Sequence, residues 1–93
     1  MTETQAVERS VRVVNAAGLH ARPAAQLVQT ASRFVCEVQV GKEGLYVNAK
    51  SIMGVLLLAA EEGSELRIRC EGEDAEEAAN EIVALVARGF GEG

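Results

Sequence analysis

Apolar and polar residues alternate in four short segments of the chain, and this two-residue period is typical of strands with one covered face. In the last segment Leu66, Ile68 and Cys70 fall on one side, while charged residues occupy the positions between them. The run Gly-Lys-Glu-Gly at 41–44 separates the second segment from the third and predicts a hairpin turn. The four predicted strands are Glu8–Val14, Phe34–Val40, Leu45–Asn48 and Glu65–Cys70.

Three other segments carry apolar residues at intervals of three and four, which is the period of an amphipathic helix. The first helix is expected to start at about Ala21, and a short second helix is predicted over 51–60 with Ser51 as its cap. The third follows Asp74, a candidate cap, and ends at Gly89. The stripe of the first helix is Ala24, Leu27, Val28 and Ala31, and that of the third is Ala75, Ala78, Ala79, Ile82, Leu85 and Val86.

The order of these elements is βαββαβα, and it predicts an α+β fold. We expect an open-faced β-sandwich, with a four-stranded, mainly antiparallel sheet and three helices on one face. A chain of 93 residues has room for one compact domain, so residues 1–93 should share a single core. Residues 1–6 and 90–93 are expected to be flexible ends.

Charge and composition exclude several function classes. Fourteen acidic residues against nine basic ones give a formal net charge of -5, which repels phosphate backbones and argues against a nucleic-acid partner. The longest apolar run, 55–60, is far shorter than the ~18 residues of a membrane span, so we expect a cytoplasmic protein without a membrane partner. Cys36 and Cys70 lack the spacing of a metal site, so we interpret them as buried hydrophobic residues and expect no metal or cofactor.

The one histidine, His20, stands between a glycine-containing loop and the start of the first predicted helix. Backbone N–H groups of a first turn lack intrahelical partners, and the helix dipole adds partial positive charge, so a phosphoryl group would be stabilised there. The same field disfavours a protonated ring and leaves neutral imidazole as a nucleophile for in-line attack on phosphorus. Position alone equally allows His20 to be an exposed helix cap without chemistry.

Residues around His20 fit the binding of a phosphoryl group. The guanidinium of Arg22 can bind phosphoryl oxygens and offset charge as the group arrives and leaves. Pro23 has no N–H to leave unpaired in a first turn, and Gly18 permits backbone angles that other residues avoid. The loop and helix start expected to stabilise the phosphate therefore consist of Gly18, Ala21, Pro23 and Ala24.

The run Gly-Leu-His-Ala-Arg-Pro-Ala at 18–24 resembles the active-site motif of HPr, the histidine-containing phosphocarrier family of the bacterial phosphotransferase system. The similarity continues through 27–32 and 47–55 and covers nearly the whole chain except its two ends. The resemblance implies a monomeric carrier, not an enzyme with its own substrate. His20 would receive phosphate on Nδ1 from phosphorylated enzyme I and pass it to the A domain of an enzyme II in sugar uptake, with phosphoenolpyruvate as the ultimate donor.

The resemblance also implies a docking face and a regulatory site. The helix predicted over 51–60 is apolar around most of its circumference, so Ile52 and Met53 should remain at least partly exposed. In the family this helix docks enzyme I, enzyme II A domains and regulatory partners, a role that passes to Ile52, Met53 and Val55. Ser51 matches the serine that an HPr kinase/phosphorylase modifies for catabolite control, although it would also serve as a plain helix cap.

The sequence departs from the family pattern at two places. Ala17 stands where members often carry a small polar residue, so backbone amides alone would hold the phosphate, and the glycine-rich end makes a contact from a terminal carboxylate to Arg22 unexpected. Two alternatives remain open. One is a regulatory or nitrogen-branch carrier without a sugar-transport role, and the other is an acylphosphatase-like hydrolase, for which the sequence offers no glycine-rich phosphate loop.

Overall fold

A computed structural model describes residues 6–92, and its elements follow the predicted βαββαβα order. The strands are β1 (Ala6–Arg12), β2 (Glu37–Lys42), β3 (Leu45–Asn48) and β4 (Glu65–Glu71). The helices are α1 (Ala21–Ser32), α2 (Ile52–Leu57) and α3 (Ala75–Ala87), followed by a 3-10 turn, η1 (Gly89–Gly91). Over residues 6–92, no helix is long and apolar enough to cross a membrane.

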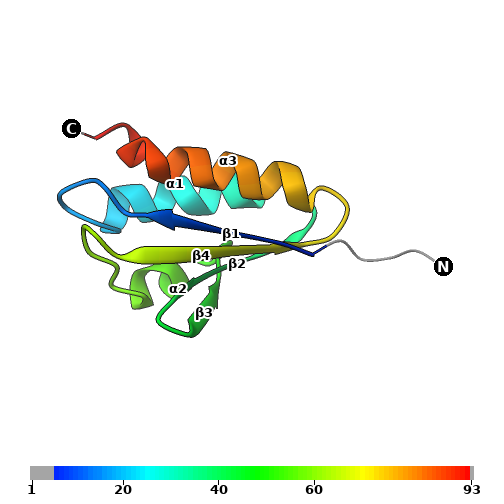
Figure 1. Cartoon of the computed structure of the whole chain (residues 1–93), viewed down its shortest axis with the longest axis horizontal. Helices are drawn as coiled ribbons and strands as arrows, with labels where there is room; N and C mark the ends of the chain where they lie inside the picture. Colours follow the sequence, from blue (N-terminus) through cyan, green and yellow to red (C-terminus); the bar gives the residue numbers. More distant parts are fainter. Residues whose placement is uncertain (1–5, 93) are drawn as a thin grey trace.

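The four strands form one antiparallel sheet in the order β1-β4-β2-β3. Figure 1 shows α1 and α3 running side by side along the sheet, with α2 near β3. In the central strand β4, Leu66 and Ile68 are fully buried, whereas Arg67 and Arg69 are exposed. One face of the sheet is therefore covered and the other is open, which confirms the predicted open-faced sandwich.

The start of α3 differs from the prediction. Asp74 occupies the N-cap position, but among the described residues its carboxylate accepts no capping hydrogen bond from the first turn of α3. It accepts instead from the backbone N–H groups of Val35 and Cys36, each at 2.9 Å, and so ties α3 to the segment that leads into β2. With that segment held in this way, β2 begins at Glu37 and not at Phe34. The predicted buried stripe of α3 is confirmed at all six of its positions.

The second helix is shorter than predicted and ends at Leu57. Ala59 has a φ of 48°, in the left-handed region, and a residue in this conformation stops a helix. The carbonyl of the following residue, Ala60, accepts a hydrogen bond from the N–H of Leu19 at 2.9 Å. The bend after α2 therefore fastens this part of the chain to the loop that precedes α1.

The carboxyl-terminal residues also differ from the flexible end expected from Phe90 onward. The Phe90 side chain is 3% exposed and belongs to the core. Gly89, Phe90 and Gly91 have consecutive positive φ values of 67°, 57° and 77°, which turn the chain back toward the loop before α1. Burial of the aromatic ring offsets the backbone strain of this turn. At the other end Ala6 already belongs to β1, and residues 1–5 and 93 lie outside the described part of the chain.

The two cysteines are free and buried, which confirms their interpretation as hydrophobic core residues. Burial, together with the Asp74 carboxylate beside it, raises the pKa of the Cys36 thiol to about 12. Because the thiolate is the reactive form, Cys36 is a weak nucleophile near neutral pH.

Candidate functional site

His20 is the N-cap residue of α1, with extended backbone angles (φ -80°, ψ -169°) and an exposed side chain. Its carbonyl accepts the first intrahelical hydrogen bond, from the N–H of Ala24 at 2.9 Å. Its imidazole makes no capping hydrogen bond within residues 6–92, so the ring is not engaged in capping the helix there. The structure therefore presents the imidazole to solvent at the positive end of a 12-residue helix.

The loop before His20 is held by hydrogen bonds on both sides. Asn15 is 2% exposed; its side-chain Nδ2 donates to the carbonyl of Gly18 at 2.9 Å, and its own carbonyl accepts from the Gly18 N–H at 3.1 Å. Gly18 has the positive φ (70°) expected of it, and a Cβ there would lie 2.5 Å from the Ala60 carbonyl oxygen. Leu19 is buried in the core. His20 thus follows a loop with little freedom to move.

Glu92 lies against His20 and was not foreseen from the sequence. Its carboxylate oxygens are 3.2 and 3.3 Å from Nε2 of the imidazole, and Oε1 also accepts from Nδ2 of Asn15 at 3.1 Å. The hydrogen bond with His20, helped by the one from Asn15, lowers the pKa of Glu92 from its ordinary value. An ionised carboxylate only accepts hydrogen bonds, so this contact is a hydrogen bond when Nε2 of His20 carries the hydrogen. No motif signals this contact, which joins residues 72 positions apart.

Arg22 and the predicted phosphate-binding residues at the start of α1 have different surroundings. Arg22 is exposed on the first turn of α1, and its charge contributes to the field at Glu92. Pro23 and Ala24 are buried, and the Ala24 N–H is already bonded to the carbonyl of His20. This corrects the role expected of Ala24, because its amide is committed to the helix. Ala21 and Arg22 come before Ala24 in the first turn, where backbone N–H groups have no intrahelical acceptor. Their N–H groups are therefore the ones suited to binding an anion.

The apolar surface of α2 is arranged differently from the prediction at one position. Ser51 caps the helix as predicted, its Oγ accepting from the Gly54 N–H at 3.2 Å. Ile52 and Met53 are 38% and 70% exposed, but Val55 is fully buried and cannot contact a partner directly. Two residues that the sequence did not single out, Leu56 and Leu57, are exposed at 39% and 71%. The helical period turns Val55 inward and leaves these leucines outside.

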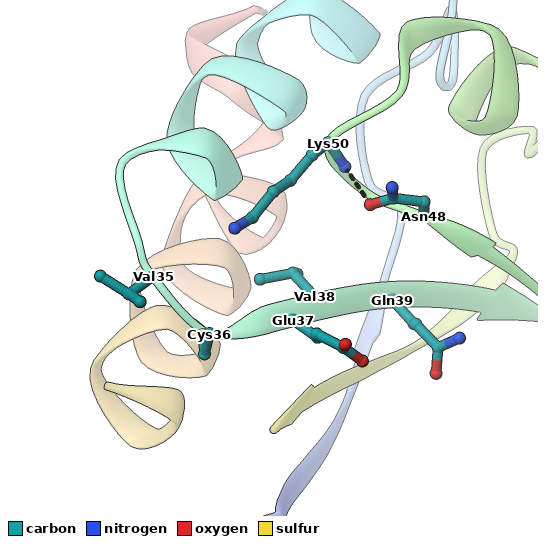
Figure 2. A pocket seen from close by; sticks show the side chains of 7 residues that line it. All are labelled: Val35, Cys36, Glu37, Val38, Gln39, Asn48 and Lys50. Carbon is teal, nitrogen blue, oxygen red and sulfur yellow. Dashed lines mark hydrogen bonds between the residues drawn. The ribbon is translucent and has the colours of Figure 1, made fainter. Parts of the chain in front are cut away.

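A shallow pocket lies elsewhere, between the segment after α1, β2 and the residues before α2 (Figure 2). Its volume is about 340 Å³, and Lys50 reaches across one side of it to donate from Nζ to the Phe34 carbonyl at 2.7 Å. The predicted site residues do not line it. His20 caps the start of α1, whereas the helix ends at Ser32, near this pocket. The pocket therefore lies at the opposite end of the helix from the imidazole.

Comparisons with known proteins agree with this geometry. A family model described as the PTS HPr component phosphorylation site matches residues 7–88. The phosphocarrier protein HPr of Cupriavidus necator is 45% identical over 94% of this chain and 98% of its own length. The HPr-like protein Crh of Halalkalibacterium halodurans is 45% identical over 88% of this chain and 98% of its own length.

The fold agrees with solved structures as well. The crystal structure of HPr from Thermoanaerobacter tengcongensis superposes with a TM-score of 0.90 at 45% identity, covering 94% of this chain and 98% of that one. The family model spans both the histidine loop and the three helices that the structure describes. The chain therefore belongs to the HPr family, the phosphocarrier proteins of the phosphotransferase system.

Proposed function

We propose that His20 carries the phosphoryl group, accepting it from phosphorylated enzyme I and passing it to enzyme II A domains in phosphoenolpyruvate-dependent sugar uptake in the cytoplasm. The observation that supports this proposal is the exposed imidazole at the N-terminus of α1, two positions before Arg22 on the same first turn. The chain acts as a monomer with partner enzymes and turns over no small-molecule substrate of its own.

The transfer is an in-line exchange at phosphorus. The lone pair of a His20 ring nitrogen forms the new N–P bond, while the bond from phosphorus to the donor breaks and its electron pair stays with the donor. The positive end of α1 and the N–H groups of Ala21 and Arg22 stabilise the incoming anion. The Arg22 guanidinium offsets charge as the group arrives and again as it leaves.

The exposed residues of α2 are the proposed docking surface for partner proteins. Ile52, Met53 and Leu57 present apolar side chains to solvent, and methionine adapts well to partners of different shape. The buried Val55 holds the helix on the core beneath them. The Ala60 carbonyl, in the segment that follows α2, accepts a hydrogen bond from the N–H of Leu19. This bond holds the segment after the docking surface against the loop that bears His20.

Ser51 is the proposed site of control by an HPr kinase/phosphorylase and a catabolite regulator. A phosphoryl group on its Oγ would add ~1.5 to 2 negative charges at the edge of the docking surface and repel an acidic partner there. The likeness to Crh of Bacillus subtilis, which is described as a catabolite repression HPr and is 46% identical, supports a regulatory role. If incubation with the kinase and ATP leaves no acid-stable phosphate on Ser51, this part of the proposal is wrong.

Incubation with enzyme I and labelled phosphoenolpyruvate tests the role of His20. The wild-type protein should acquire acid-labile label that passes on to an enzyme II A domain, and His20→Ala should acquire none. Arg33→Ala, which alters an exposed residue at the far end of α1, is the matched control and should be labelled normally. Label retained by His20→Ala would overturn the proposal, and hydrolysis of acyl phosphate without partners would favour a hydrolase instead.

A further inference from the structure

The geometry points to Glu92 as a positioning residue for phosphoryl transfer: its carboxylate holds the hydrogen on Nε2 of His20, so that Nδ1 keeps the lone pair that attacks phosphorus. This inference rests on the proposed role of His20 as the phosphoryl acceptor. A neutral imidazole carries its one N–H on either nitrogen, and the partner of one nitrogen decides which tautomer is present. Here that partner is the acceptor-only carboxylate of Glu92 at 3.2 Å.

Glu92 is itself held in place from the opposite side. Asn15, which is 2% exposed, donates from the same Nδ2 to Glu92 Oε1 at 3.1 Å and to the Gly18 carbonyl at 2.9 Å. One buried amide group therefore links the carboxylate to the loop that carries His20. The Glu92 side chain is 22% exposed, compared with 43% for His20, so the carboxylate is the more sheltered partner of this pair.

The backbone before Glu92 is built to bring its side chain to this position. Phe90 is buried although its φ of 57° is unfavourable for a bulky residue, and it stands between two glycines that also have positive φ. The Glu92 N–H then donates to the Gly89 carbonyl at 2.9 Å, which closes the turn. The buried ring of Phe90 thus anchors a tight left-handed turn, and the residue that emerges from it contacts the imidazole.

The contact also suits the charge that develops during transfer. When the Nδ1 lone pair forms the N–P bond and the donor bond breaks, the ring becomes a phosphorylated imidazolium that still carries its hydrogen on Nε2. The Glu92 carboxylate accepts that hydrogen bond before and after the step, and its negative charge opposes the new positive charge of the ring. No proton has to leave the imidazole during phosphorylation.

The test is ¹⁵N NMR of the His20 ring in the full chain, at alkaline pH where the imidazole is neutral. The wild-type ring should be almost entirely in the Nε2–H form. In Glu92→Gln, whose amide can donate as well as accept, the Nδ1–H form should increase about two- to fivefold, the range expected for an exposed pair. Glu92→Ala should show the same increase, and Glu62→Ala, which removes an exposed acid elsewhere, should show none.

The rate of phosphorylation by enzyme I distinguishes the positioning role of Glu92 from the carrier role of His20. The rate should fall by a similar factor in Glu92→Gln and Glu92→Ala, with unchanged thermal stability in Glu92→Gln, and His20→Ala should not be labelled. If the tautomer populations of both Glu92 variants equal those of the wild type while His20→Ala loses its label, the role of Glu92 is wrong and that of His20 stands. If His20→Ala is still labelled, the proposed function itself fails.

Discussion

Asp74 accepts a hydrogen bond from the backbone N–H of Cys36, 38 residues earlier in the chain, at 2.9 Å. Its second carboxylate oxygen accepts from the N–H of Val35 at the same distance. One side chain thus joins the start of α3 to the entry of β2. The two backbone hydrogen bonds, with that from Val35 contributing most, lower the pKa of Asp74 from its ordinary value of 3.8.

The lowered pKa of Asp74 makes the stability of the fold depend on pH in the acid range. Because the folded pKa lies below the unfolded one, the stabilisation is fully present above about pH 4 and is lost as the pH falls through the folded pKa. We expect Asp74→Asn to be less stable than the wild type at pH 7, with a difference that shrinks as the pH is lowered. Urea unfolding at a series of pH values measures this, and parallel curves for the two proteins would contradict it.

Gly18→Ala should destabilise the protein by about 1 to 3 kcal/mol, because the new Cβ meets the Ala60 carbonyl and the backbone keeps a positive φ. Gly44→Ala is the matched control. Gly44 also has a positive φ (86°), but a Cβ there meets no atom within 4 Å in the described structure. Gly44→Ala should therefore lose less stability in chemical denaturation. Equal losses in the two variants would show that the close approach of Gly18 to Ala60 is unimportant.

Substitutions at two positions of α2, one buried and one exposed, should affect the stability of the fold and the binding of a partner separately. Val55→Ala removes buried methyl groups and should lower the free energy of unfolding by about 2 kcal/mol. Met53→Ala, at an exposed position, should change it by less than about 0.5 kcal/mol but weaken binding to enzyme I. Denaturation and titration calorimetry measure the two effects. If Met53→Ala binds enzyme I with wild-type affinity, the Met53 side chain does not belong to the docking surface.

Arg22→Ala should fold normally and exchange phosphate with enzyme I more slowly, on the order of a hundredfold, since the guanidinium stabilises charge that develops in transfer. Rapid-quench measurement of the labelling rate gives this factor. Arg22→Lys, which keeps the charge but not the planar fork, should recover part of the rate. A rate for Arg22→Ala equal to that of the wild type would exclude electrostatic assistance by this residue.

The sequence was informative where structure follows a local period. The alternation around Ile68 and the buried stripe of α3 depend only on which residues face a common core, so both could be predicted. The inward turn of Val55 was missed because α2 is apolar on almost every side, and its sequence does not distinguish the buried face from the exposed one.

Contacts between distant residues could not be predicted in this way. The hydrogen bond from the Cys36 backbone N–H to the Asp74 carboxylate depends on how the sheet order brings α3 beside the start of β2. The contact between Glu92 and His20 depends on a left-handed turn at Phe90, where a bulky residue adopts a conformation that its own preferences disfavour. The glycines on either side of Phe90 indicate a flexible end when considered alone, and only the burial of the ring shows otherwise.

The carrier role of His20 is tested by NMR of the phosphorylated protein, with ³¹P and with ¹⁵N-labelled histidine, after incubation with enzyme I and phosphoenolpyruvate. We expect a single N–P bond on Nδ1 of His20, with the hydrogen still on Nε2 beside Glu92. A phosphoryl group on Nε2, or on any residue other than His20, would contradict it.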